Sequence, residues 1–168
     1  MRIGLGCMRL PSDGARDVIA AALSEGIDLF DTARAYGESE RVVGAALAGT
    51  GARIVTKCGM RRDGEAWVPD GRASSILEDV KASVDALGRP IDLLLLHAPD
   101  PRTPLATSIR AMVQAKDAGA ARALGVCNVS RRQLEEIADL APIAAVQVAL
   151  GAHDDDAARG GVVAWCAA

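Results

Sequence analysis

The stretch that decides the fold is residues 91–97, with the sequence IDLLLLH. An almost unbroken apolar run of this length predicts a β-strand, Ile91–Leu96, that is buried on both faces, as the strands of parallel sheets are. The strand ends at a polar residue, His97, directly after four leucines. Because such strands are covered by helices on their faces, the run predicts an α/β protein and draws attention to the polar residue at the strand end.

Shorter apolar runs alternate with helical stretches on both sides of this strand. The other predicted strands are Ile3–Leu5, Ile27–Phe30, Arg53–Thr56, Ala123–Val126 and Ala144–Val146. The predicted helices are Ala15–Glu25, Ser39–Leu47, Ser74–Leu87, Pro104–Ala118 and Arg131–Leu140. Residues 58–71 predict a polar loop, and the tail, Asp154–Ala168, predicts a helix, with a short strand at Gly161–Cys166 as the alternative. The alternation has no linker, so it predicts one domain over residues 1–168 with a parallel sheet.

Two architectures fit about six strand–helix units: an open doubly wound sheet, or part of an eight-fold barrel. The open sheet commonly binds dinucleotides through a Gly-x-Gly-x-x-Gly turn after its first strand. Here Gly4 and Gly6 are followed by Arg9 at the third glycine position, and Pro11 interrupts the expected helix start. The sequence therefore favours an α/β fold of the (β/α)8 TIM-barrel type, truncated to about six βα units.

Composition excludes several classes of protein. Half of the 168 residues are hydrophobic and 24% are charged, which excludes a wholly disordered chain. The net charge of −3 gives no basic excess for nucleic acid. No apolar run approaches the roughly 20 residues of a membrane span, and the start lacks a secretory signal, so we expect a cytoplasmic protein. The four cysteines are widely separated, which predicts reduced thiols rather than a disulfide framework.

Polar residues close five successive strands at their C-terminal ends. These residues are Asp31, Lys57, His97, Asn128 and Gln147. Each one by itself is consistent with a strand that simply ends. In a parallel barrel, however, these ends share one face, and that face carries the chemistry. Five in succession therefore predict an active site.

Four residues suggest a mechanism. Tyr36 follows the strand that ends at Asp31. A free tyrosine has a pKa of about 10, and an ammonium such as that of Lys57 would lower this pKa. Asp31 could supply the counter-charge of Lys57, and His97 could orient a carbonyl oxygen by a hydrogen bond. The matching reaction is hydride delivery to a carbonyl with proton donation by Tyr36, and the hydride must come from a cofactor.

At these residues the sequence resembles the aldo-keto reductase family. The stretches that carry the resemblance, in matching order and spacing, are FDTARAYG at 30–37, VTK at 55–57, DLLLLH at 92–97, LGVCN at 124–128 and VQ at 146–147. The resemblance runs from about Gly4 to the end of the chain. It implies an eight-stranded barrel that reduces aldehydes and ketones, small-molecule carbonyl substrates, with NADPH.

The resemblance also implies roles for individual residues. Its catalytic tetrad corresponds to Asp31, Tyr36, Lys57 and His97. The residues implied to contact the nicotinamide carboxamide are Asn128 and Gln147. Cys127 stands where the family usually has serine, and a thiol forms weaker hydrogen bonds than a hydroxyl, which predicts an altered cofactor contact.

The length departs from the family pattern. A complete (β/α)8 barrel takes roughly 250 residues, so two βα units are missing, and these hold the pyrophosphate and 2′-phosphate contacts in the family. Three explanations stay open. The chain is a fragment of a longer reductase, which we favour; or a second copy or another chain completes the barrel; or the catalytically inactive truncated barrel is a nucleotide- or protein-binding module. Unpaired strand edges also favour self-association.

Three further features allow more than one interpretation. Cys7, Cys58, His97 and Cys127 could approach one another as metal ligands, but no pair has a recognised spacing, and Cys58 should face away from its neighbour Lys57, so no metal is predicted. Trp67, in the predicted loop, is either a pocket wall or a packed surface aromatic. Arg34 either meets an anionic substrate or the cofactor, or points to solvent.

Overall fold

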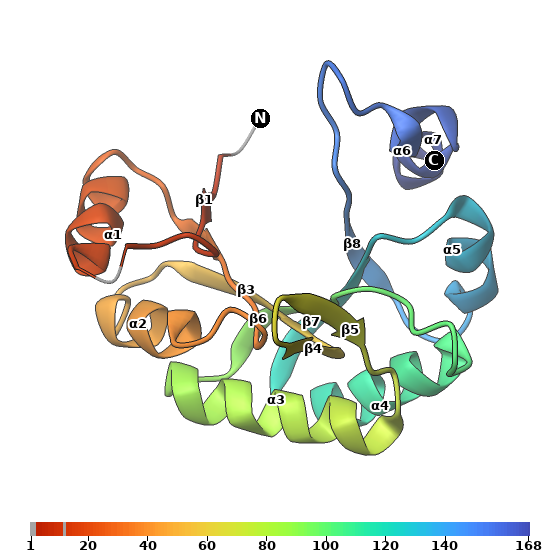
Figure 1. Cartoon of the computed structure of the whole chain (residues 1–168), viewed down its shortest axis with the longest axis horizontal. Helices are drawn as coiled ribbons and strands as arrows, with labels where there is room; N and C mark the ends of the chain where they lie inside the picture. Colours follow the sequence, from red (N-terminus) through yellow and green to blue (C-terminus); the bar gives the residue numbers. More distant parts are fainter. Residues whose placement is uncertain (1–2, 12) are drawn as a thin grey trace.

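The structure, a computed structural model, describes residues 3–11 and 13–168. Met1, Arg2 and Ser12, which belong to the predicted single domain, lie outside the described residues. A six-stranded parallel sheet, in the order β1-β2-β3-β6-β7-β8, curls into part of a barrel, and helices α1 to α5 lie along its outer side (Figure 1). This arrangement confirms the predicted α/β class and the parallel sheet.

The observed elements follow the predicted order closely. The sheet consists of β1 (Leu5–Gly6), β2 (Leu29–Asp31), β3 (Arg53–Cys58), β6 (Ile91–Leu96), β7 (Ala121–Cys127) and β8 (Ile143–Gln147). The helices are α1 (Ala15–Ser24), α2 (Ser39–Ala46), α3 (Ala73–Leu87), α4 (Leu105–Asp117), α5 (Arg131–Ile137), α6 (Asp156–Arg159) and α7 (Val162–Ala167). A separate antiparallel hairpin consists of β4 (Met60–Asp63) and β5 (Ala66–Pro69).

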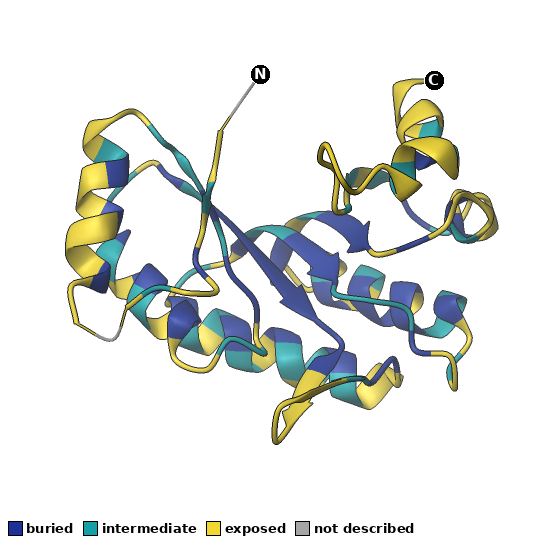
Figure 2. Cartoon of the chain, turned by 45° about the horizontal axis from the view of Figure 1, so that its top comes forward, coloured by how far each residue is buried: buried dark blue, intermediate teal, exposed yellow. Residues whose placement is uncertain are grey.

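The central strand β6 is buried on both faces, as its leucines predict. Leu94 and Leu96 belong to the large core cluster beneath the helices. Leu95 points to the opposite, inner face, where it packs with Val55 and Cys127. Figure 2 shows the dark blue central strands between exposed outer helix faces. Burial on both faces explains why this strand shows no polar alternation.

Two sequence predictions about irregular segments are wrong. Residues 58–71 are not simply a loop, because they contain the β4–β5 hairpin. The strand positions there are mostly exposed, and β4 carries three successive charged residues, so the hairpin lacks the period-two apolar pattern that identifies a half-buried strand. The tail forms two short helices instead of one long helix or a strand, because the chain turns at Gly161, whose φ is +78°.

A close approach of β7 and β8 places the last strand. A Cβ atom at Gly125 would collide with the carbonyl oxygen of Ala145 and lie 2.5 Å from Leu95 Cδ2. Only glycine therefore allows β8 to lie this close at the register that pairs Cys127 with Gln147. Thus Gly125 helps to bring the polar ends of both strands to the same edge.

The sheet ends at β1 on one side and β8 on the other, each paired on a single edge within the described residues. The self-association predicted from such edges stays a prediction. Within residues 3–11 and 13–168, no helix is both long and apolar enough to cross a membrane.

Candidate functional site

A buried ion pair lies at the C-terminal ends of β2 and β3. Lys57 Nζ donates to Asp31 Oδ1 at 2.6 Å and to the backbone oxygen of Thr32 at 2.9 Å. The Lys57 side chain is only 3% exposed and that of Asp31 is 25% exposed. The next residue, Cys58, is buried in the outer core cluster, because successive strand residues point to opposite faces. Within the site, the carboxylate of Asp31 balances the charge of Lys57.

Tyr36 and His97 complete the predicted tetrad. The Tyr36 ring centroid lies 5.7 Å from that of His97, and the two rings meet edge to face at 80°. Lys57 Nζ lies 5.2 Å from the Tyr36 ring centroid. Tyr36 follows β2 in a turn, where its backbone N–H donates to the Ala33 oxygen. The structure thus brings the four residues together, and their catalytic roles stay a prediction.

The Tyr36 phenol keeps its proton strongly. Burial, followed by the charge of Asp31 and by Cys127, raises the pKa of Tyr36 to about 12. The net shift is opposite to the sequence prediction, in which the charge of Lys57 lowers the pKa of Tyr36. The Lys57 ammonium is already bound to Asp31 and a backbone carbonyl, and burial dominates. Tyr36 is therefore a protonated donor at neutral pH.

His97 is a neutral imidazole at the same end of the sheet. Burial, and then the nearby Lys57 charge, lower the pKa of His97 to about 4, although Asp31 acts in the opposite direction. Its buried Nδ1 has no hydrogen-bond partner among the described residues. A neutral imidazole has one N–H donor and one acceptor nitrogen. His97 can therefore donate one hydrogen bond to a polar atom brought into the site.

The His97 shift predicts an acid-sensitive contribution to stability. Between pH 6.5 and about 4 the unfolded chain binds a proton that folded His97 does not. The contribution of neutral His97 to the free energy of unfolding is complete above pH 6.5 and is lost as the pH falls toward about 4. We expect His97→Gln to lose less stability than the wild type between about pH 7 and about pH 4.5, in urea denaturation.

His153→Gln serves as the matched control for that experiment, because His153 is the only other histidine and it lies exposed. This variant should lose stability as the wild type does. Equal losses in the His97 variant and the wild type would contradict the shift.

The other three predicted residues lie at the same edge. Asn128 has a left-handed backbone, with φ of 55°, and its Nδ2 donates to the His97 backbone oxygen at 2.9 Å. Gln147 Nε2 donates to Asp31 Oδ2 at 2.9 Å, and its Oε1 lies 3.5 Å from Cys127 Sγ. Gln147 thus links the last strand of the sheet to β2. The five polar residues that close the strands therefore lie at one edge of the sheet, as the parallel topology predicts.

A cavity of about 680 Å³ lies on the inner face of the sheet beside Asp31 and Gln147. Its other lining residues are mostly apolar and come from the sheet strands, from the segment after β8 and from α7. Concave apolar sites with a few polar groups are typical of small-molecule binding. Of the four tetrad residues, only Asp31 lines this cavity.

Trp67, on the hairpin strand β5, lies against the tetrad. Its ring centroid is 6.0 Å from that of Tyr36 and 5.8 Å from that of His97. The side chain is 42% exposed, so one part of the ring packs on the site and another part faces outward. Trp67 is thus a partly exposed aromatic packed on two tetrad residues, and its role as a pocket wall stays a prediction.

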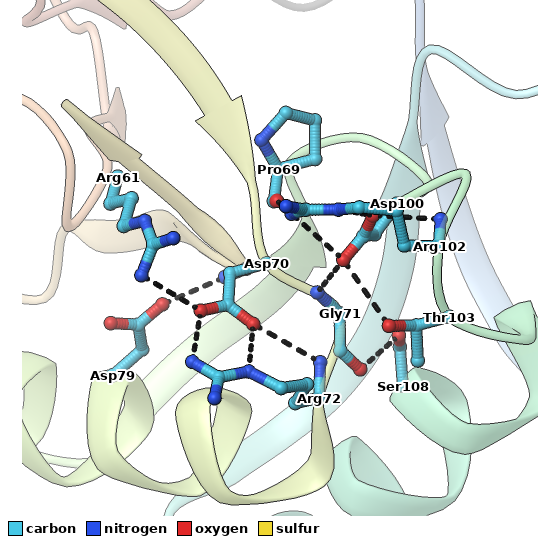
Figure 3. Close-up of polar contacts among 11 residues, drawn as sticks. Arg61, Pro69, Asp70, Gly71, Arg72, Asp79, Asp100, Arg102, Thr103 and Ser108 are labelled. Atoms are coloured by element: carbon cyan, nitrogen blue, oxygen red, sulfur yellow. Dashed lines mark hydrogen bonds and ion pairs between the residues drawn. The ribbon is translucent and has the colours of Figure 1, made fainter. Parts of the chain in front are cut away.

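Two aspartates anchor the base of the hairpin (Figure 3). Asp70 accepts from Arg72 Nη2 at 2.6 Å and from Arg61 Nη1 at 3.2 Å, and the Arg72 hydrogen bond holds the pKa of Asp70 well below its usual range. Asp100 accepts the backbone N–H of Gly71 at 3.0 Å. These contacts tie the chain after β5 to the starts of α3 and α4. The contacts of Asp70 with Arg61 and of Asp100 with Gly71 were not predicted, because they join residues that only the fold brings near.

Other polar groups do not form a metal centre. Among the described residues, no group of three or more histidine, cysteine, aspartate or glutamate side chains could hold a metal ion. Arg34 is exposed, and the remaining cysteine, Cys166, is exposed as well.

Comparison with known proteins identifies the family. The model of the Aldo/keto reductase family matches residues 2–168. The chain belongs to this family. It is 35% identical over 161 residues to the aldo-keto reductase YhdN of Bacillus subtilis (strain 168), which covers 87% of this chain and 49% of that protein. The chain spans about half the length of the curated aldo-keto reductases that it matches.

Solved aldo-keto reductases share the fold. The glycerol dehydrogenase AKR11B4 from Gluconobacter oxydans matches with a TM-score of 0.80 and 36% identity, over 88% of this chain and 50% of that one. The holo form of AKR11C1 from Bacillus halodurans matches with a TM-score of 0.87 and 28% identity, over 98% and 58%. These neighbours are (β/α)8 barrels, so the aldo-keto reductase chain described here corresponds to part of such a barrel.

Proposed function

We propose that this chain reduces aldehyde or ketone carbonyls to alcohols, with a hydride from NADPH and a proton from Tyr36. The observation that carries the proposal is the convergence of the Tyr36 phenol, the His97 imidazole and the Lys57–Asp31 pair at the C-terminal ends of the strands. Family membership supports the reaction class. The proposed substrate is a small carbonyl compound.

Each residue has a distinct part in this proposal. Neutral His97 donates a hydrogen bond to the carbonyl oxygen and orients it. As negative charge develops on that oxygen, the Tyr36 proton passes to it and the alcohol forms. A phenolate remains at Tyr36, and the ammonium of Lys57, 5.2 Å from the ring centroid, stabilises that charge. Asp31 holds Lys57 in place through the 2.6 Å ion pair.

The residues at the strand ends fit a nicotinamide group. A bound reduced nicotinamide supplies the hydride. Asn128 would hold its carboxamide through the side-chain oxygen, which accepts no hydrogen bond from the described residues. Gln147 would be the second contact, and it must exchange its bond to Asp31 for one to the cofactor. Cys127 contributes only a weak donor beside it.

A fluorescence titration of the purified chain with NADPH tests cofactor binding, followed by turnover on a panel of aldehydes. We expect saturable one-site binding and NADPH oxidation that depends on the aldehyde. A parallel titration with NADH measures the cofactor preference. Binding without turnover by a chain that circular dichroism shows to be folded would contradict catalysis and favour the nucleotide-binding module. No binding would contradict the proposal for this chain.

A further inference from the structure

Arg62 lies over the Trp67 ring. Its Cζ atom is 4.3 Å from the ring centroid. The two residues are directly paired across the β4–β5 hairpin, so their side chains project from the same face of it. The centroid of the Trp67 ring also lies 5.8 Å from that of His97. The distance from the guanidinium to the His97 ring therefore cannot exceed the sum of these two distances. Arg62 thus places a cation near the site.

The charge of Arg62 is not balanced within the described protein. The other arginines at the base of the hairpin are paired: Arg61 and Arg72 with Asp70, and Arg102 with Asp100. Arg62 forms no ion pair or hydrogen bond with the residues that the structure describes. The Arg62 guanidinium makes a cation–π contact with the Trp67 ring, and this contact does not use the guanidinium N–H donors in hydrogen bonds.

The position of the cation is also constrained. The hairpin that carries Arg62 and Trp67 is held at its base by Asp70 and Asp100, as Figure 3 shows. A cation whose conformational freedom is already restricted loses less entropy when it binds an anion. The net charge of −3 means that no general positive field attracts anions to this chain. A preference for anionic ligands would therefore be local to Arg62.

We propose that Arg62, supported by Trp67, binds a carboxylate at the far end of the carbonyl substrate. The proposal rests on the proposed function, because it takes the carbonyl end to lie at Tyr36 and His97. In this proposal the spacer between the two ends lies along the Trp67 ring, which contacts both the cation and the rings of Tyr36 and His97. Guanidinium and carboxylate match in shape and can form two parallel hydrogen bonds. The favoured substrate class is thus an aldehyde acid.

Isothermal titration calorimetry without cofactor tests this subsite independently of turnover. The probes are 4-carboxybenzaldehyde and its neutral methyl ester, titrated into the whole chain. We expect the acid to bind about fivefold more tightly than the ester, the scale of a partly exposed charge pair. Added salt should reduce this preference because it screens the charges.

Three variants locate the effect. Arg62→Gln should remove the preference for the acid and leave ester binding unchanged, and Arg62→Lys should retain part of it, since the charge is kept and the planar fork is lost. Arg132→Gln is the control: it removes the same charge from an exposed residue of α5, outside the hairpin, and leaves the Arg61–Asp70 contact intact. It should keep the preference.

Equal affinities of the wild type for acid and ester, no binding of either, or a preference that survives in Arg62→Gln would overturn the proposal. Because no cofactor is present, an intact preference in a chain that fails to oxidise NADPH would uphold the subsite and reject only the proposed reduction. Turnover of the neutral ester, without tighter binding of the acid, would uphold the proposed reduction and reject only the carboxylate subsite.

Discussion

Replacing Tyr36 with phenylalanine is expected to lower kcat for aldehyde reduction by about 100- to 10,000-fold, the usual contribution of a positioned general acid. The substitution removes only the hydroxyl, and the ring can keep its edge contacts with Trp67 and His97. We therefore expect the variant to fold. Steady-state turnover of an aldehyde at saturating NADPH measures the effect.

Two measurements accompany this experiment. NADPH affinity should be unchanged in Tyr36→Phe, because Asn128 and Gln147 are the proposed cofactor contacts, and circular dichroism should show an intact fold. Since the pKa of Tyr36 is about 12, its phenol stays protonated through neutral and mildly alkaline pH, so its titration should not reduce wild-type kcat there. A variant that retains turnover within tenfold of the wild type would contradict the assignment of Tyr36.

Replacing Asp31 with alanine is expected to destabilise the fold by about 3–5 kcal/mol, the cost of leaving a buried charge without its partner. Lys57 is 3% exposed and would keep only the Thr32 carbonyl as a partner among the contacts described. The double variant Asp31→Ala/Lys57→Met should recover part of that loss, because it removes the stranded charge. Urea denaturation of the two single variants and the double variant gives the coupling free energy.

The chain offers a matched control for this cycle. Lys81 and Asp85 form an ion pair at the same 2.6 Å distance, but their side chains are 79% and 64% exposed. Asp85→Ala should change stability little, since water screens both charges. Equal effects of Asp31→Ala and Asp85→Ala would show that burial of the first pair does not matter for stability.

Much of the sheet could be predicted because its strands are buried on both faces. Residues 91–96 were assigned with correct bounds, since an apolar run between a helix end and a polar residue leaves few alternatives. Bounds were less accurate in the short strands: β1 was expected at Ile3–Leu5 and lies at Leu5–Gly6. The hairpin was missed because its short, mostly exposed strands have no apolar alternation to detect.

In the candidate site, too, some features could be predicted from the sequence and others could not. The sequence predicted that Asp31, Lys57 and His97 would meet, because parallel strands bring their ends to one edge. It did not predict that Gln147 would donate to Asp31, since that contact joins residues 116 positions apart along the chain. Nor could it predict the upward pKa shift of Tyr36, which depends on how deeply the ring is buried and on which partners Lys57 already has.

By itself, the sequence determined the strand–helix alternation, the parallel sheet and the set of polar residues at its edge, because these follow from local periodicity and from the topology that such periodicity requires. Only the tertiary structure decided the surroundings of those residues. Burial sets the pKa values of Tyr36 and His97, and the anchored hairpin places Trp67 and Arg62 beside them. Both effects depend on distances between segments remote in sequence, which no local pattern encodes.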